Sequence, residues 1–292
     1  MDLISIFKNN IVSINVATSG KISFMLKFGI SPCPNDIFIF FGLIEKRINT
    51  YGLIFDFIIE DVETLNNLCM KNALDISKVS SHAFYYLQNN YSMLSSGGAL
   101  SEHGPVAITK NLERLKSLST LRIALPGRLT TASALMWFYW KKFFSEKQYI
   151  INFMPFYKII DKVVNEEADI GVVIHEGRFI YSSKGVDLVK DLGKFWIEET
   201  SLPIPLGLII YKKALNIKSI LEKIIRESLQ YSYSHFDEAM NFIKKYSQEL
   251  DEDVIKSHIE CYINEFTFDM GNKGIEAINE LFKKIEREPI WS

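Results

Sequence analysis

Short apolar runs alternate along most of the chain with stretches whose apolar residues have helical spacing. Strands are predicted at 26–30, 53–59, 75–80, 105–109, 121–126, 149–155, 169–174 and 206–213. Between strands the apolar positions recur every three or four residues, as at Val62, Leu65, Leu68 and Cys69, which predicts helices. This alternation is typical of parallel strands joined by helical crossovers, so we expect an α/β fold with mostly parallel sheets.

The last quarter of the chain is predicted to be helical. Helices are expected at 217–229, 236–248, 252–264 and 272–287, and the first of them carries one apolar stripe. A length of 292 residues favours two domains. Because no Pro/Gly/Ser-rich linker separates two halves, we expect short crossing strands to join them, with a binding cleft at the seam.

Composition excludes several classes of function. The chain has 33 basic and 35 acidic residues and no long basic run, so a nucleic-acid partner is not expected. Its three cysteines are far apart and form no CxxC pair, which predicts neither a disulfide framework nor a metal site. No apolar run is long enough to span a membrane, and stable membrane association is not expected. Residues 1–24 lack the pattern of a signal peptide, so they are predicted to be an extension outside the fold of a cytoplasmic protein.

Two proline-containing turns precede predicted helices. "SPCPND" ends in Asn35-Asp36, which suit a helix N-cap or, through the first-turn N–H groups, an anion site. "PGRLTTA" places Thr130 and Thr131 at the start of a strongly apolar helix. Hydroxyls beside free N–H groups suit a carboxylate, but the same residues are good caps, and residue types alone do not decide between the two roles. Neither segment is a P-loop.

Two further segments carry weaker signals. Lys78 and Ser80 stand at the end of a predicted strand, where Ser80 either donates a hydroxyl to a ligand or caps the next helix. "LPIPLG" has two prolines that hold an extended path, which fits a cleft wall or a linker between domains.

His175 is the residue with the most chemical interest. It follows the apolar run "DIGVVI" and begins the turn "HEGR". The zincin motif is absent because Phe179 stands where a second histidine would be needed, and no nucleophile elbow accompanies the ring. A single imidazole remains, which is suited to general base chemistry near neutral pH. A hydrogen-bonded structural histidine is the alternative.

Taken together, these segments resemble the 1,4-dihydroxy-6-naphthoate synthase family of the futalosine route to menaquinone. The resemblance runs in family order from about residue 28 to the C-terminal helices, on "SPCPNDIFIF", "EDVETLN", "SKVS", "SGGAL", "PGRLTTA", "GVVIHEGRF", "DLGKFW" and "LPIPLG". One departure is Ser101-Glu102-His103, where the family is usually glycine-rich, and we expect a stiffer loop there.

The resemblance implies a two-lobed fold like that of periplasmic solute-binding proteins, with an interlobe cleft as the active site. The first lobe would comprise residues 25–112 and 207–292, and the second residues 113–206. The family's catalytic proton acceptor falls on His175. Its substrate-binding segments fall on Lys78, Val79 and Ser80 and on Thr131 and Ala132, and we add the neighbouring Thr130 and Asn35 on physical grounds.

The activity implied by the resemblance is a lyase reaction. Cyclic dehypoxanthine futalosine would be converted to 1,4-dihydroxy-6-naphthoate without a metal or redox cofactor. Trp137, Phe138 or nearby aromatic residues would pack against the aromatic ring of the substrate. The expected partner is this small carboxylate, with a homodimer left open. The alternative from another class is a solute-binding protein that captures a small carboxylate and catalyses nothing.

Overall fold

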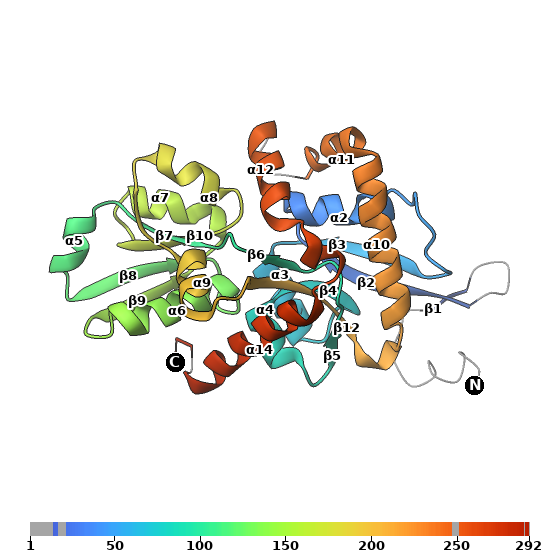
Figure 1. The fold of residues 1–292 in the computed structure, drawn as a ribbon, viewed down its shortest axis with the longest axis horizontal. Helices are drawn as coiled ribbons and strands as arrows, with labels where there is room; N and C mark the ends of the chain where they lie inside the picture. Colours follow the sequence, from blue (N-terminus) through green and yellow to red (C-terminus); the bar gives the residue numbers. More distant parts are fainter. Residues whose placement is uncertain (1–13, 17–21, 247–250, 289, 292) are drawn as a thin grey trace.

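A computed structural model describes residues 14–16, 22–246, 251–288 and 290–291. Within these residues the chain forms two halves, each built on one sheet (Figure 1). The first sheet has seven strands: β1 (Ile14–Val16), β2 (Ile22–Ile30), β3 (Ile54–Ile59), β4 (Ile76–Ser80), β5 (Tyr91–Met93), β6 (Ala99–Ser101) and β12 (Ile204–Lys212). The second has five, in the order β11 (Asp187–Asp191), β7 (Val106–Thr109), β10 (Ile170–Val173), β8 (Thr120–Leu125) and β9 (Gln148–Phe153).

The expected α/β class is present, but both sheets are mixed rather than mostly parallel. Parallel pairs join β2 to β3 and β4, and β8 to β9 and β10. By contrast, β12 runs antiparallel to β4, β5 and β6, and β7 runs antiparallel to β10 and β11. The cause is the path of the chain: β7 and β12 enter their sheets at the crossings between the halves, without the helical crossover that makes neighbouring strands parallel.

The crossings lie close to residues 102–105 and 201–203, between β6 and β7 and just before β12. β7 therefore belongs to the second sheet, although the division of the sequence after residue 112 assigns it to the first lobe. At the N-terminus, β1 pairs with β2 at residues that the sequence assigns to the extension. The rest of that segment, 1–13 and 17–21, lies outside the described residues.

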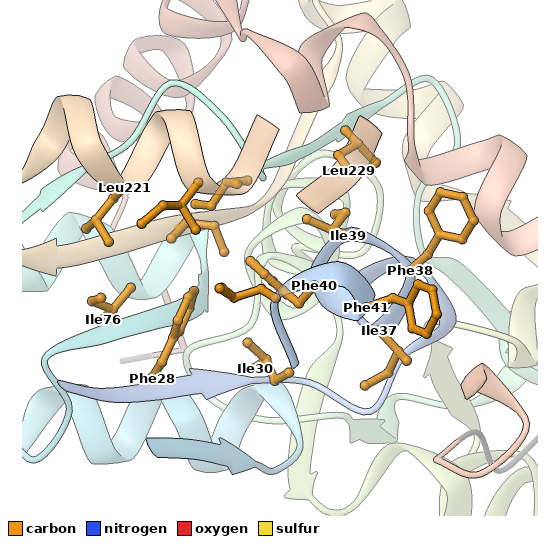
Figure 2. Packing of buried hydrophobic residues seen from close by; sticks show 14 of the residues in the cluster. Phe28, Ile30, Ile37, Phe38, Ile39, Phe40, Phe41, Ile76, Leu221 and Leu229 are labelled. Atoms are coloured by element: carbon orange, nitrogen blue, oxygen red, sulfur yellow. The ribbon is translucent and has the colours of Figure 1, made fainter. Parts of the chain in front are cut away.

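Helices cover both faces of the first sheet. One face is covered by α2 (Pro34–Ile44), α10 (Lys218–Ser234), α11 (Phe236–Ile243) and α12 (Glu252–Tyr262). The other carries α3 (Val62–Met70), α4 (Ser81–Leu87) and α14 (Gly271–Arg287). α2 is apolar nearly all round because β2 and three helices enclose it, and Phe38 and Phe40 are fully buried there (Figure 2). Residues 247–248 of the helix expected at 236–248 lie outside the described residues.

The second sheet is covered by α6 (Thr131–Phe143) and α9 (Leu192–Thr200) on one face and α7 (Ile159–Val164) on the other. The C-terminal segment joins the halves. Ala277 of α14 packs in the first, whereas Leu281, Ile285 and Trp291 pack with the core of the second. The shorter elements are α5 (Leu112–Ser117), α8 (Gly177–Ile180), α13 (Glu265–Phe268) and the 3-10 turns Phe156–Lys158, Tyr181–Lys184 and Lys213–Leu215.

A close backbone approach fixes the first crossing. A Cβ on Gly193 of α9 would lie 2.6 Å from the backbone nitrogen of Gly104, and one on Gly104 would lie 2.8 Å from the Cα of Gly193. Leu192 N also donates to Pro105 O at 3.0 Å. Only glycine at both positions lets the crossing pack against the start of α9.

We expect Gly193→Ala to lower the free energy of unfolding by about 1–3 kcal/mol, because the new methyl group would meet backbone atoms rather than a mobile side chain. Urea denaturation measures this. Gly98→Ala is the matched control, since its Cβ would find its nearest neighbour at 3.4 Å. Equal unfolding midpoints for the two variants would contradict the steric account.

Candidate active site

One cavity lies between the two halves, with an empty volume of about 660 Å³ that includes space open to solvent. The structure brings all eight predicted site residues to its lining: Asn35, Lys78, Val79, Ser80, Thr130, Thr131, Ala132 and His175. The first crossing contributes Gly104 and Pro105, and β12 contributes Leu206 and Gly207. Their presence in one lining is an observation of geometry, and the role of each residue remains a prediction.

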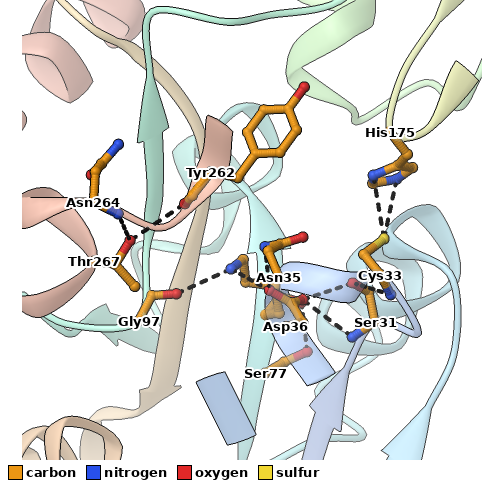
Figure 3. A network of polar contacts seen from close by, with 11 residues as sticks. Ser31, Cys33, Asn35, Asp36, Ser77, Gly97, His175, Tyr262, Asn264 and Thr267 are labelled. Atoms are coloured by element: carbon orange, nitrogen blue, oxygen red, sulfur yellow. Dashed lines mark hydrogen bonds and ion pairs between the residues drawn. The ribbon is translucent and has the colours of Figure 1, made fainter. Parts of the chain in front are cut away.

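The floor of the cavity is a buried ion pair. The Asp36 carboxylate accepts hydrogen bonds from Ser31 Oγ at 2.7 Å, from Asn35 Nδ2 at 3.0 Å and from Lys78 Nζ at 2.7 Å (Figure 3). Lys78 also donates to Gly97 O at 3.0 Å. The Lys78 side chain is only 5% exposed and that of Asp36 1%. Because Asp36 neutralises its charge, Lys78 is not a free cation for a substrate carboxylate.

The turn before α2 differs in detail from the expected cap. Cys33 occupies the N-cap position and Pro34 the first helical position, so Asn35 and Asp36 lie inside the first turn. Proline is favoured there because its missing N–H would be unpaired in any case. This offset turns Asp36 toward Lys78 and places the Cys33 thiol at the edge of the cavity.

Ser80 ends β4 and stands at the N-cap position of α4, but it makes no side-chain capping bond. Instead Asn66 holds it on both sides: Asn66 Nδ2 donates to Ser80 Oγ at 3.2 Å, and Ser80 N donates to Asn66 Oδ1 at 2.9 Å. Since the oxygen already accepts a bond, its proton is the part left to donate to a ligand.

The threonines at the start of α6 do serve as structural groups. Thr130 Oγ1 caps the helix by accepting from Ser133 N at 3.2 Å. Thr131 Oγ1 donates to Leu206 O at 2.9 Å and so ties the second half to β12. What this wall offers a ligand is therefore mainly the backbone N–H groups of Thr131 and Ala132, at the start of a thirteen-residue helix where N–H groups have no acceptor within the helix.

His175 follows β10 in a left-handed backbone conformation, with φ of 54°. That region is uncommon for residues other than glycine, although histidine is one of the types that adopt it more readily, and it sets the direction in which the side chain leaves the turn. The turn is anchored by Arg178, which donates to Gly104 O at 2.6 Å and to Asp191 at 2.7 Å. The residue as a whole is half-buried, and its imidazole contacts the Phe156 ring at 4.9 Å between centroids.

The Cys33 side chain contacts the His175 ring. Its Sγ lies 3.3 Å from Nδ1 and 3.6 Å from Nε2 of the imidazole (Figure 3). Burial, reinforced by the charge of Asp36, raises the pKa of the Cys33 thiol well above its usual value, so the thiol keeps its proton. Burial lowers the pKa of His175, although the nearby acidic charges of Glu176, Asp36 and Asp61 oppose the shift. The pair is therefore a neutral thiol beside a neutral imidazole near pH 7.

The sequence did not reveal one wall of the cavity, and two aromatic residues predicted to line the cavity lie elsewhere. His258 and Tyr262, four residues apart on α12, both line the cavity. Their spacing puts them on one helix face, but the same spacing describes any core stripe. Trp137 and Phe138, expected to pack against a substrate ring, are instead buried in the core of the second half, where Trp137 contacts Trp291 at 4.8 Å.

The departure at 101–103 is tied into the structure. Ser101 Oγ donates to Cys261 O at 2.6 Å and accepts from His103 N at 3.0 Å.

In the described part of the chain, no group of three His, Cys, Asp or Glu side chains is placed to hold a metal ion. None of the described helices combines the length and apolar character needed to cross a membrane.

A family model described as menaquinone biosynthesis matches residues 26–287. The chain belongs to this family. It is 36% identical over 264 residues to a 1,4-dihydroxy-6-naphthoate synthase of Thermus thermophilus, covering 89% of this chain and 94% of that one. It is 32% identical over 266 residues to the enzyme of the same name from Streptomyces coelicolor, covering 90% and 93%. The resemblance seen in the sequence is thereby confirmed at the level of the family.

Solved structures give the fold. Protein AF1704 from Archaeoglobus fulgidus superposes with a TM-score of 0.82 at 31% identity, over 90% of this chain and 97% of that one. The Candida albicans CA3427 gene product, described as having the generic periplasmic binding protein fold, gives 0.65 at 15% identity over 91% of each chain. The expected periplasmic-binding-protein-like fold is thus confirmed, with mixed sheets as the correction.

We expect Lys78→Met to lower the free energy of unfolding at neutral pH by about 3–5 kcal/mol, because it leaves the Asp36 charge buried without its partner. Urea denaturation followed by circular dichroism measures the change. Lys116→Met is the control: Lys116 pairs with Glu113 at 2.8 Å on the surface, where losing an ion pair costs less than about 1 kcal/mol. Similar losses in both variants would refute a special role for the buried pair.

Proposed function

We propose that this chain is a 1,4-dihydroxy-6-naphthoate synthase, a lyase that converts cyclic dehypoxanthine futalosine to 1,4-dihydroxy-6-naphthoate, with His175 as the general base. The observation that carries the proposal is the position of His175. It is a neutral imidazole in a left-handed turn, facing a cavity whose other walls are the predicted substrate-binding segments. The names of the relatives from Thermus thermophilus and Streptomyces coelicolor support the same activity.

The substrate carboxylate is assigned to the start of α6. The positive end of the helix dipole and the N–H groups of Thr131 and Ala132 favour an anion, and the Ser80 hydroxyl proton adds a donor from the opposite half. Binding at this place touches both halves at once. We therefore propose that the two sheets mark two lobes, the first made from both ends of the chain and the second from its middle, which hold the ligand between them.

His175 is assigned the proton abstraction. A neutral imidazole nitrogen takes the proton of an acidified C–H bond of the sugar part, so that the C–H bond breaks and an N–H bond forms. The electron pair left on carbon drives cleavage of a carbon–carbon bond, and this cleavage releases a sugar-derived fragment. Because the naphthoate product is aromatic, the later steps have a driving force that the protein need not supply. The proposal calls for no metal, no redox cofactor and no nucleic acid, and it places the enzyme in the cytoplasm.

The alternative is a binding protein without catalysis, because the fold is shared with solute-binding proteins. The two are separated by one assay. Purified protein is incubated with cyclic dehypoxanthine futalosine, and the naphthoate absorbance is followed. Product formation at catalytic turnover supports the synthase, whereas saturable binding without product would establish the alternative.

We expect His175→Asn to keep the fold and substrate binding but to lower kcat by about 10²–10⁴-fold, which is the usual contribution of a general base. Asn tolerates the left-handed conformation, so the turn is preserved. His103→Asn, on the exposed loop, is the matched control and should leave kcat unchanged. Full activity of the His175 variant would reject the assignment of the base.

The rate should also report the pKa of His175. Burial lowers this pKa below its usual value of 6.5, and only the neutral ring accepts a proton. In the free enzyme, kcat/KM is therefore expected to be flat through neutral pH and to fall only as the pH drops below 6.5, through the lowered pKa. A pH profile of kcat/KM tests this. If kcat/KM already begins to fall near pH 7.5 as the pH is lowered, the result would contradict a base kept neutral by burial.

A further inference from the structure

α12 brings a second imidazole to the cavity. His258 is 1% exposed and lines the cavity together with Tyr262, one helical turn further on. Its ring centroid lies 4.7 Å from that of Tyr262 and 6.2 Å from that of His175. Among the described residues, neither Nδ1 nor Nε2 of His258 has a hydrogen-bond partner, although both atoms are buried.

Two unpartnered nitrogens on one buried ring require an explanation, because buried polar groups in native proteins are nearly always hydrogen-bonded. His258 lies at the wall of the cavity, so its partners can come from whatever fills that space. The neutral ring has one N–H donor and one acceptor. Burial, with a smaller contribution from His175, lowers the pKa of His258 well below its usual value, so the ring stays neutral.

Tyr262 extends the same wall. In the view of Figure 3 the Tyr262 and His175 rings both stand above the network around Asp36. Burial raises the pKa of the Tyr262 phenol above its usual value, so the hydroxyl keeps its proton. The α12 face therefore presents uncharged donors and an acceptor, in contrast to the dipole of α6, and it suits hydroxyl or carbonyl oxygens rather than a carboxylate.

We propose that His258, assisted by Tyr262, binds the uncharged, oxygen-rich sugar part of the substrate and holds it against His175. This inference rests on the proposed function and adds a specificity element to it. With the carboxylate at the start of α6 and the sugar at α12, the carbon that loses its proton lies between two fixed ends. His258 thus acts as a binding and positioning residue.

The test compares two ligands that differ in the sugar. Calorimetry is run on His175→Asn, which is expected to bind substrate with strongly reduced turnover, and on the double variant His175→Asn/His258→Phe, with cyclic dehypoxanthine futalosine and with 1,4-dihydroxy-6-naphthoate. Phe keeps a ring of similar size and removes both nitrogens. We expect the affinity for the sugar-bearing substrate to fall about tenfold, as for one lost hydrogen bond, and the affinity for the product to change less than about twofold.

Two further variants separate binding from packing. His258→Gln keeps a donor and an acceptor and should retain more substrate affinity than His258→Phe, and Tyr262→Phe should show a smaller loss with the same ligand preference. Thermal unfolding verifies each fold, and the Gln variant carries the comparison if Phe does not fold.

The outcomes are distinct. Unchanged substrate affinity, or equal losses for substrate and product, overturns the role of His258 while the proposed function stands. Absence of both binding and conversion in the unaltered protein overturns the proposed function, and the role of His258 falls with it.

Discussion

The buried pair between Asp36 and Lys78 is the constraint on which the cavity depends. It joins three segments that are distant in sequence: the first turn of α2, strand β4 and the loop at Gly97. Taking two charges out of water is costly, and the pair persists only because Ser31 and Asn35 complete the bonding of the carboxylate. These hydrogen bonds fix the conformation of the segment from Ser31 to Asp36. That conformation determines where Cys33 contacts His175.

The second half is held to this floor by contacts that are mostly uncharged. The hydroxyl of Thr131 bonds to the backbone of β12, Arg178 bonds to the backbone of the crossing at Gly104, and α14 packs against both cores. Each contact lies next to the cavity or crosses the seam. The groups that join the two halves therefore also set the position of His175 relative to the Asp36–Lys78 pair. A change in the contacts between the halves is expected to change the geometry of the site.

The sequence predicts the order of the longer elements because their patterns are local. The strands now labelled β3, β4 and β8 and helices α6 and α10 lie within a few residues of their expected positions. The three-residue strands β5 and β6 were not predicted, since so short a segment shows no period. The direction of β12 was also beyond reach, because it depends on how the chain returns from the second sheet.

The candidate site, like the fold, could be predicted from the sequence only where the signal is local. The segments around Lys78, Thr131 and His175 could be identified from sequence, but not the state of each side chain. Lys78 turns out to be neutralised by Asp36, and the Thr131 hydroxyl is bonded to the backbone of β12, because these facts depend on partners far away in the chain. His258 was passed over because a buried histidine on a helix gives no sequence signal that separates it from core packing.

A common electrostatic logic links these groups. Burial shifts the pKa values of the His175 and His258 imidazoles and of the Tyr262 phenol, which line the cavity, and of the neighbouring Cys33 thiol, so that the uncharged form of each is favoured. The one ion pair is internally compensated, so the helix dipole of α6 is the strongest remaining feature for an anion. Under the proposed function, such a cavity would orient a substrate that has a single carboxylate at one end and would place a neutral imidazole at the other. A site built only to capture anions would gain from a free cation, whereas proton abstraction by an imidazole requires that the base stay unprotonated; the arrangement of charges here favours the second task.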